Sequence, residues 1–303
     1  MEEIYDTIIL GGGAAGFSAS IYTARYNLKT LVIAKEIGGT TNLAHEIENW
    51  PGFIGSGIEL MNNFKEHSEK LGVEIVQTEI VSIEKKDNLF IIKDSSRNYI
   101  GKTIIITLGS EHKKLNIPGE EEFLGKGVSY CATCDGTFFR NKEVIVIGGA
   151  NSAASAALYL STMAKKVYIS YRKEKMRCEP ISLEKLNKRE NVEFVYNSIP
   201  LEILGDSKTN KIKLSMINSD EEKEIDIDGV FIEIGSTPLT KLVEGLGIKI
   251  NNEGYIEIDK EMRTSIDGVF AAGDITNNVF KQVVTASGDG AIAAKSAYEY
   301  LDK

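Results

Sequence analysis

Thr7-Ile8-Ile9-Leu10-Gly11-Gly12-Gly13-Ala14-Ala15-Gly16 is a short apolar strand that runs directly into a glycine-rich turn. A helical stretch follows to about residue 26, and a second apolar strand covers residues 28–34. This order of elements is typical of a dinucleotide-binding βαβ unit. In such a unit Gly11 makes the tight turn, Gly13 lets the backbone approach a pyrophosphate, and Gly16 lets the helix pack closely on the strand. A glycine-rich loop without a ligand is the alternative interpretation.

The end of the second strand departs from the usual pattern, in which an acidic residue holds a ribose. Here the strand ends in Ala34-Lys35-Glu36, so either Glu36 contacts the ribose or the ribose is held in another way. Trp50, in the polar region that follows, is either a core residue or a neighbour of a cofactor. Residues 58–71 are predicted to form an amphipathic helix, and residues 73–100 alternate as antiparallel strands do.

A second unit of the same kind begins after residue 143. Val144-Ile145-Val146-Ile147 is predicted to be a strand, and Gly148-Gly149-Ala150-Asn151-Ser152-Ala153 is the turn that follows it. A helix to about residue 163 and a strand over residues 166–170 complete the repeat. The chain therefore contains a duplicated nucleotide-binding architecture.

The C-terminal part returns to nucleotide-binding sequence. Val269-Phe270-Ala271-Ala272-Gly273-Asp274 is predicted to be a strand that ends in a ribityl- or phosphate-binding turn, and residues 282–301 form a helix with small residues on one face. The expected fold class is α/β. It consists of two Rossmann-like nucleotide-binding domains of the three-layer ββα type, one inserted in the other.

Cys131-Ala132-Thr133-Cys134-Asp135-Gly136 carries the candidate chemistry. Two cysteines separated by two residues can close into an exchangeable disulfide, and an adjacent carboxylate can exchange protons with a leaving thiolate. Half of a zinc site is the alternative, but such a site needs four ligands. Cys178 is the only other cysteine, and the histidines lie upstream without ligand-like spacing, so no metal is expected.

Composition limits the possible functions. The chain has 303 residues, 42% hydrophobic and 26% charged, and a formal net charge of −9. These values are typical of a globular protein of about two domains, and the negative charge disfavours nucleic acid as a partner. The sequence has no apolar stretch of membrane-spanning length and no visible signal peptide, so a cytoplasmic location and no membrane partner are expected.

The chain resembles the low-molecular-weight thioredoxin reductases, which are flavin disulfide reductases, over nearly its whole length. The motifs that carry the resemblance are residues 11–16, Glu48-Asn49-Trp50-Pro51-Gly52, residues 127–136, residues 269–274 and Gln282-Val283-Val284-Thr285-Ala286. The resemblance implies an FAD-binding domain formed by residues 1–113 and 242–303. It also implies a central domain, residues 114–241, that carries the redox-active dithiol and a pyridine-nucleotide fold.

The resemblance also assigns roles. Cys134 would face the flavin, Cys131 would attack the disulfide of thioredoxin, and Asp135 would act as acid and base. A homodimer is implied, with rotation of one domain against the other about hinges near residues 113–119 and 235–241. The implied FAD contacts are Gly11, Gly13, Ala14, Ala15, Gly16, Lys35, Glu36, Gly39, Thr40, Asn49, Val81, Thr107, Gly109, Gly273, Asp274, Lys281, Gln282 and Val283.

The central domain departs from the family where NADPH normally binds. Ala150 replaces the middle glycine of the second turn, and its Cβ hinders approach of a pyrophosphate. In the cluster that usually binds the 2′-phosphate, Tyr171 replaces a histidine and Lys173 replaces an arginine, whereas Arg172 and Arg177 are kept. Lysine does not reproduce the fork geometry of arginine. The chain is therefore most similar to the ferredoxin-dependent flavin thioredoxin reductases, in which electrons pass from ferredoxin through FAD to the Cys131/Cys134 dithiol and on to thioredoxin.

Three other interpretations stay open at this point. The first is an NADPH-dependent thioredoxin reductase, the second is an oxidase of small-molecule dithiols, and the third is a flavoprotein that senses redox state without catalysis. The basic residues between 172 and 189 form either a docking patch for an acidic ferredoxin or an ordinary solvated face of mixed charge.

Overall fold

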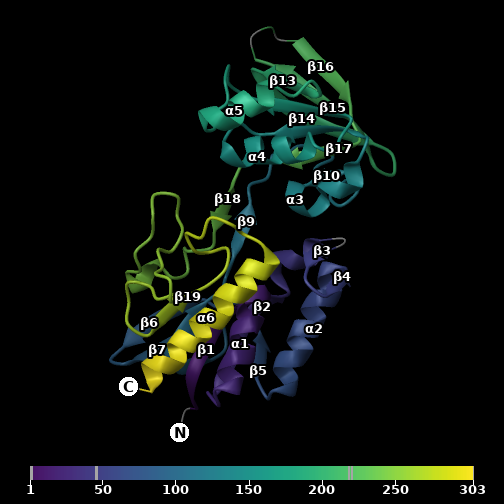
Figure 1. Cartoon of the computed structure of the whole chain (residues 1–303). Coiled ribbons are helices and arrows are strands. Elements are labelled where there is room, and N and C mark those ends of the chain that lie inside the picture. Colours follow the sequence, from purple (N-terminus) through teal and green to yellow (C-terminus); the bar gives the residue numbers. More distant parts are fainter. Residues whose placement is uncertain (1–2, 45–46, 218, 220, 303) are drawn as a thin grey trace. The chain divides into compact units, whose positions relative to one another are not determined.

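The computed structural model describes residues 3–44, 47–217, 219 and 221–302, and it divides into two compact units. The outer unit comprises Met1–Glu111 and Thr237–Lys303, and the inserted unit comprises His112–Ser236 (Figure 1). Both contain a parallel sheet with helices, so the predicted α/β class with Rossmann-like units is confirmed. Among the described residues, no helix is long and apolar enough to cross a membrane.

The outer unit is built on one seven-stranded sheet with the order β5-β2-β1-β8-β7-β6, in which β19 also pairs with β8. Its central strands are parallel, with Ile8 of β1 opposite Leu31 of β2 and Ile104 of β8. The elements of this unit are β1 (Ile4–Gly12), α1 (Ala14–Arg25), β2 (Thr30–Ile37), η1 (Gly39–Leu43), β3 (Ile47–Trp50), β4 (Phe53–Gly55), α2 (Gly57–Lys70), β5 (Glu74–Gln77), β6 (Ser82–Lys86), β7 (Leu89–Lys93), β8 (Asn98–Ile106), η3 (Glu244–Leu246), β19 (Val269–Ala271) and α6 (Val283–Leu301).

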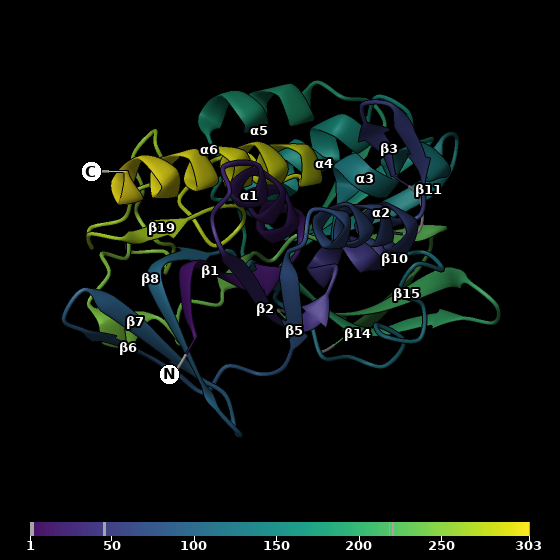
Figure 2. The same cartoon turned by 90° about the horizontal axis from the view of Figure 1, so that it is seen from below.

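Both faces of this sheet are covered. Figure 2 shows α1, α2 and α6 on one face, where Ile9, Val32 and Ile105 pack with the alanines of α1 and α6. On the other face, Ile8 and Ile104 pack against apolar residues of β6 and of the segment that precedes β19. Burial on two faces explains why the central strands read as continuous apolar runs and not as alternating ones.

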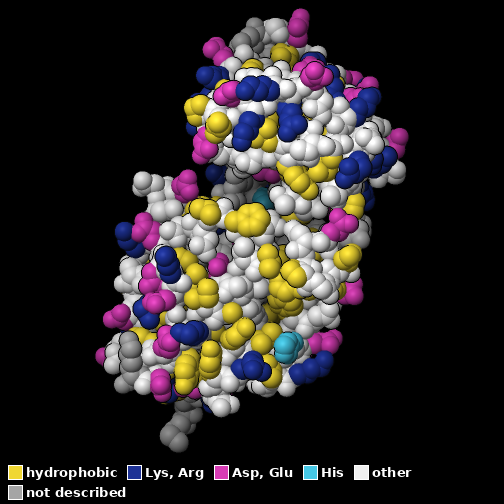
Figure 3. Space-filling model, in the orientation of Figure 1, with side chains coloured by type: hydrophobic (Ala, Val, Ile, Leu, Met, Phe, Trp, Pro, Cys, Tyr) yellow, Lys and Arg dark blue, Asp and Glu magenta, His cyan; other side chains and the backbone are white. Residues whose placement is uncertain are grey.

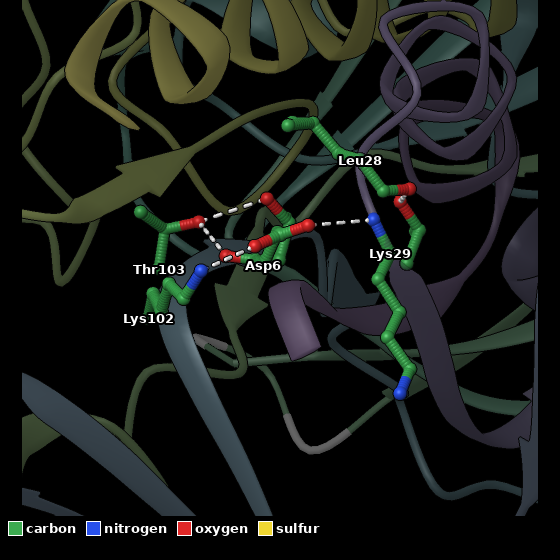
Figure 4. A network of polar contacts seen from close by, with 7 residues as sticks. Asp6, Leu28, Lys29, Lys102 and Thr103 are labelled. Atoms are coloured by element: carbon green, nitrogen blue, oxygen red, sulfur yellow. Dashed lines mark hydrogen bonds and ion pairs between the residues drawn. The ribbon is translucent and has the colours of Figure 1, made fainter. Parts of the chain in front are cut away.

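A polar network at the start of the sheet fastens three neighbouring strands (Figure 4). One carboxylate oxygen of Asp6 in β1 accepts a hydrogen bond from the amide of Lys29, 2.9 Å away, just before β2. The other accepts one from the ammonium group of Lys102 in β8 at 2.7 Å. The hydroxyl of Thr103 donates to the Asp6 carbonyl at 2.8 Å. These contacts hold the register of β1 against both of its neighbours.

The inserted unit repeats the pattern on a smaller scale. A five-stranded parallel sheet has the order β10-β17-β11-β12-β13, and a separate antiparallel sheet has the order β14-β15-β16. Its elements are β10 (Val128–Ser129), α3 (Ala132–Asp135), η2 (Gly136–Phe139), β11 (Glu143–Ile147), α4 (Asn151–Leu160), β12 (Lys166–Tyr171), α5 (Pro180–Asn187), β13 (Val192–Tyr196), β14 (Ser198–Gly205), β15 (Thr209–Met216), β16 (Glu221–Asp226) and β17 (Gly229–Ile232).

The two connections between the units are more regular than the sequence suggested. The chain passes between the units through a two-stranded sheet formed by β9 (Ser110–His112) and β18 (Ser236–Pro238). β18 lies within the predicted hinge at residues 235–241, and β9 ends just before the predicted hinge at residues 113–119. The amide of Lys113 donates to the carbonyl of Gly235 at 3.0 Å, and the amide of Leu239 donates to the carbonyl of Gly109 at 3.2 Å. Paired strands constrain each other, so the two connections must change conformation together.

Close packing of α6 on α1 depends on one glycine. A methyl group added at Gly290 would lie 2.1 Å from the carbonyl oxygen of Ala15, so only a bare Cα fits between the helices. At Gly288, one half-turn earlier in α6, an added methyl group would meet nothing within 4 Å. The two positions therefore form a matched pair for testing the helix contact.

We expect Gly290→Ala to destabilise the outer unit by about 1–3 kcal/mol, because the added methyl group forces the helices apart. Gly288→Ala should be neutral or stabilise by up to about 1 kcal/mol, because alanine has the higher helix propensity. Thermal unfolding followed by circular dichroism, together with the temperature of flavin release, measures both effects. Equal midpoints for the two variants would contradict the packing argument.

Candidate functional site

The first glycine turn leaves an open space at the N-terminus of α1. Gly11 has φ +119°, and a methyl group there would lie 2.4 Å from the carbonyl oxygen of Thr107. At Gly16 it would lie 2.0 Å from the carbonyl oxygen of Gly11. Both glycines are thus required by packing, whereas an added methyl group at Gly13 would meet nothing within 4 Å. The bare backbone of Gly13 faces a space that suits a pyrophosphate at a helix N-terminus.

Other predicted flavin contacts surround this turn. Gly39 in η1 lies beside Gly13, because its added methyl group would be 3.7 Å from the Gly13 Cα. Gly273 lies beside Ala15 in the same way, at 3.0 Å from the alanine Cβ. The folding of the outer unit therefore brings together turns from β1, β2 and β19, which are remote in the sequence.

The N-terminus of α6 joins the same region. Gln282 is the N-cap residue and forms a reciprocal capping box with Thr285. The side-chain NH2 group of Asn49 donates a hydrogen bond to the side-chain oxygen Oε1 of Gln282 at 3.0 Å. The contact links the predicted Asn49 motif to the predicted Gln282 motif across 233 positions of sequence.

For Lys35, Glu36 and Val81, no described side-chain interaction reaches the turn, although the backbone carbonyl oxygen of Glu36 would lie 3.5 Å from a methyl group added at Gly12. Lys35 and Glu36 are exposed at the end of β2, and the ammonium group of Lys35 forms an ion pair with Glu79 at 2.8 Å. Val81 has a side chain that is 64% exposed, and its amide donates to the carbonyl of Lys93. Their contact with a flavin stays a prediction.

Two half-buried carboxyl groups, those of Asp274 and Asp289, lie near the Gly273 turn. Burial raises the pKa of Asp274, the positive charge of Lys281 opposes this shift, and Asp289 adds to it. The ammonium group of Lys281 donates to the carbonyls of Asp274 and Thr276 at 2.9 and 2.7 Å. Sequence reasoning identified Asp274 and Lys281 but missed Asp289, which accepts from the amide of Gly273 at 3.3 Å. An acidic residue in the small-residue stretch 286–290 of α6 was the available signal.

The second glycine turn has the same backbone arrangement as the first, but it exposes different groups. Gly148 has φ +151°, and an added methyl group would lie 2.3 Å from the carbonyl oxygen of Glu233, so this glycine is kept by packing. The next residue, Gly149, lies under the ring of Tyr171, whose atoms are 2.4 Å from a methyl group added there. Ala150 is the N-cap residue of α4 and is exposed, at the position that Gly13 holds in the first turn.

Arg177 is held at the side of this turn. Its amide donates to the carbonyl of Gly149 at 2.6 Å, and its guanidinium Nε donates to the hydroxyl of Tyr171 at 2.9 Å. The ring of Tyr171 is buried between these groups. The tyrosine that replaces the family's histidine thus engages a basic residue that the family resemblance assigns to the 2′-phosphate.

Cys131 and Cys134 form the predicted disulfide at the start of α3, with their Cα atoms 5.3 Å apart. Cys131 is the N-cap residue of this short helix, and its sulfur accepts a hydrogen bond from the amide of Cys134 at 3.2 Å. The hydroxyl of Ser129 donates to the carboxylate of Asp135 at 2.6 Å and accepts from the amide of Cys131 at 3.0 Å. Ser129, which sequence reasoning did not assign a role, therefore links Asp135 to the backbone of Cys131.

Two further carboxyl groups contact residues that are next to the cysteines in the sequence. Glu120 is buried and accepts hydrogen bonds from the amides of Leu115 and Asn116 and from the hydroxyl of Tyr130, next to Cys131. Glu233 follows β17, and the backbone of Ala132 donates a hydrogen bond to its carboxyl group. Burial raises the pKa of Glu233 to about 7. The signal for Glu233 was a carboxylate directly after the apolar run of β17.

Comparison with known proteins places this geometry in a family. Residues 5–290 match the model of the pyridine nucleotide-disulphide oxidoreductases. A thioredoxin reductase of Bacillus subtilis is 43% identical, in an alignment that covers 100% of this chain and 96% of the relative.

Two solved structures are also similar. The thioredoxin reductase of Streptococcus pyogenes has a TM-score of 0.94 at 37% identity, covering 100% of this chain and 99% of that one. A ferredoxin-flavin thioredoxin reductase of Clostridium acetobutylicum has a TM-score of 0.54 at 35% identity, covering 100% and 99%.

We expect Gly13→Val to weaken FAD binding by at least about tenfold, which is about 1.4 kcal/mol, because its side chain fills the open space of the first turn. Ala150→Gly is the matched control in the second turn and should leave FAD binding unchanged. Titration of apoprotein with FAD, followed by flavin fluorescence, measures both. Full FAD affinity in Gly13→Val would show that the flavin phosphates bind elsewhere.

Proposed function

We propose that this chain, which belongs to the pyridine nucleotide-disulphide oxidoreductase family and acts as an FAD-containing thioredoxin reductase, takes its electrons from reduced ferredoxin and not from NADPH. The proposal rests on a difference between the two glycine turns of the chain. Their backbones have the same arrangement, but the groups that they expose to a ligand differ. The first has bare backbone at Gly13, and the second has a methyl group at Ala150 and an aromatic ring over Gly149.

The first turn fits a dinucleotide phosphate group. Its open space lies at the N-terminus of α1, where unpaired backbone amides and the helix dipole favour negative charge. The residues that we propose to hold the flavin are those that the outer unit brings together here: Gly11, Gly13, Gly16, Gly39, Asn49, Gly273, Asp274 and Gln282. When bound, FAD supplies a group that accepts electrons singly and delivers them as a pair.

The second turn suits such a ligand less well. The Cβ of Ala150 projects where a pyrophosphate needs close approach to the backbone. The guanidinium of Arg177 is engaged by Tyr171, and Lys173 lacks the planar fork that recognises a phosphate through two bonds. Phosphate recognition would therefore require both a shift of the turn and the loss of a buried contact.

Two further considerations support ferredoxin. The similar ferredoxin-flavin thioredoxin reductase of Clostridium acetobutylicum aligns over the whole chain. Thioredoxin has a potential of about −270 mV and plant-type ferredoxins of about −400 mV, so transfer of two electrons is downhill by about 6 kcal/mol.

The chain's own residues account for the disulfide chemistry. We propose that Cys131, as a thiolate, attacks the disulfide of thioredoxin and forms a mixed disulfide, which Cys134 then resolves. The thiol of Cys134 must lose a proton as it attacks, and the departing thioredoxin thiolate must gain one. Asp135 can exchange these protons, because Ser129 holds its carboxylate beside the cysteine turn.

NADPH dependence is the second candidate, and specific residues favour it. The second turn keeps Gly148 and Gly149, and Arg172 and Arg177 remain in the segment after β12. The identity of 43% and 42% to the thioredoxin reductases of Bacillus subtilis and Treponema pallidum gives this candidate further weight.

The remaining proposals concern assembly and location. We propose a homodimer in the cytoplasm. Apolar side chains gather on the visible face of the outer unit (Figure 3), where Tyr22 of α1 and Val284, Ile292 and Tyr300 of α6 are 39–43% exposed. A second copy of the chain would cover such a surface.

Anaerobic titration tests the donor directly. We expect neither NADPH nor NADH to bleach the flavin absorbance of the oxidised protein. We expect reduced ferredoxin to bleach it fully after about four equivalents, because two electrons reduce the Cys131–Cys134 disulfide and two more reduce the flavin. Addition of oxidised thioredoxin should then restore the absorbance. Rapid stoichiometric bleaching by NADPH would reject ferredoxin as the required donor and establish the second candidate.

Substitution of each cysteine tests the thiol roles. Cys131→Ser should abolish thioredoxin reduction, whereas Cys134→Ser should keep the attacking thiol and accumulate a mixed disulfide with thioredoxin. Cys178→Ser is the control and should retain wild-type turnover, because Cys178 is a half-buried free thiol that packs with the core of the inserted unit. Mass spectrometry under non-reducing conditions measures the adduct. A mixed disulfide in Cys131→Ser instead would reverse the two roles.

A further inference from the structure

Glu233 brings a second carboxyl group to the cysteine turn from another element. It follows directly after β17, and its amide donates to the carbonyl of Ile147 at 2.8 Å, which continues the pairing of β17 with β11. In the parallel pairing of β10 with β17, Ser129 lies opposite Phe231, so the segments that continue from the two strands bring Glu233 beside the cysteine turn. There its carboxyl group contacts the backbone of Ala132, the first residue of α3. Ala132 lies between Cys131 and Cys134, so Glu233 contacts the same short helix that carries both sulfurs.

Glu233 is half-buried, so its carboxyl group is partly withdrawn from water. Burial raises its pKa, and the hydrogen bond from Ala132 lowers it. The ionisable groups on the neighbouring elements are the two cysteines and Asp135 of α3, and Tyr171 with Arg177 beside the second glycine turn. The guanidinium of Arg177 donates a hydrogen bond to the Tyr171 hydroxyl.

Reduction of the disulfide changes the charge at this place. A disulfide that receives two electrons and one proton becomes one thiol and one thiolate, and the thiolate is a negative charge in the first turn of α3. Two negative charges close together raise each other's pKa values, most strongly where water is scarce. The ionised carboxylate of Glu233, next to Ala132, therefore disfavours formation of the thiolate. Protonation of this carboxylate removes the repulsion.

We infer that Glu233 is a positioning residue that couples proton uptake to the dithiol: it binds a proton from solvent when the Cys131–Cys134 disulfide is reduced and releases it when the disulfide forms again. The flavin supplies the electron pair, and the disulfide of thioredoxin accepts it. Glu233 acts through its contact with α3 and through the electrostatic potential that its charge creates at the two sulfurs. Asp135, in contrast, exchanges protons with the reacting groups. This inference rests on the redox role proposed for the two cysteines and does not depend on the electron donor.

Redox equilibration at several pH values tests the coupling. The complete flavoprotein is equilibrated anaerobically with mixtures of reduced and oxidised dithiothreitol between pH 6 and pH 8.5. It is then quenched with acid, and the thiols at Cys131 and Cys134 are counted by alkylation and mass spectrometry. Glu233→Gln keeps a hydrogen-bond acceptor for Ala132 but cannot ionise. Glu174→Gln, which removes an exposed carboxylate after β12, is the control.

The expected result is a pH-dependent difference. At pH 6 the equilibrium constant for reduction should agree within about twofold between the wild-type protein and Glu233→Gln, because Glu233 is then mostly protonated. At pH 8.5 the wild-type constant should be lower by about tenfold, equivalent to 29.6 mV for a two-electron couple, because the ionised carboxylate then opposes the thiolate. Glu174→Gln should follow the wild-type protein throughout.

Other outcomes reject the inference. A constant ratio between Glu233→Gln and the wild-type protein at all pH values would mean a structural role only. If the variant does not fold, an infrared difference spectrum of the wild-type protein at pH 7.5, reduced minus oxidised, decides: a gained protonated-carboxyl band supports the coupling and an unchanged band rejects it. No exchange of the Cys131–Cys134 disulfide with dithiothreitol would overturn the redox role itself. Failure of ferredoxin alone as a donor leaves the inference intact.

Discussion

Close approach of backbone to backbone is the constraint on which the outer unit depends. The carbonyl oxygen of Gly11 lies where a side chain on Gly16 would be, and the carbonyl oxygen of Ala15 lies where one on Gly290 would be. These contacts seat α1 on β1 and α6 on α1. As a result, the N-termini of both helices and the Gly273 turn lie at one edge of a parallel sheet, which is where ligands of such sheets bind.

The inserted unit reuses this plan with a different outcome. Gly148 keeps the tight turn, since the carbonyl oxygen of Glu233 leaves no room for a side chain. Above that turn, Tyr171 fills the space over Gly149 and Ala150 covers the approach to the helix. Packing thus keeps the fold of the second turn, while its surface differs from that of the first turn. The ferredoxin proposal rests on this difference.

The inserted unit instead concentrates carboxyl groups around a short helix. Asp135 is held by Ser129 within the cysteine turn itself, and Glu233 reaches the same turn from the end of β17. Disulfide exchange moves protons together with electrons, so two carboxyl groups in different environments can serve different steps. Glu120 and Tyr130 fasten the segment that leads from the first connection to Cys131.

The sequence alone determined the βαβ units, the α/β class and the pairing of Cys131 with Cys134, because glycine spacing, apolar strands and a CxxC motif are local patterns. It also indicated that Ala150 and Lys173 depart from a nucleotide site. Only the tertiary structure showed that Tyr171 packs on Gly149 and holds Arg177, that Asp289 caps the Gly273 turn, and that Glu233 reaches Ala132. Such contacts depend on strand order and on side-chain burial between segments up to about 100 residues apart, which no local pattern encodes.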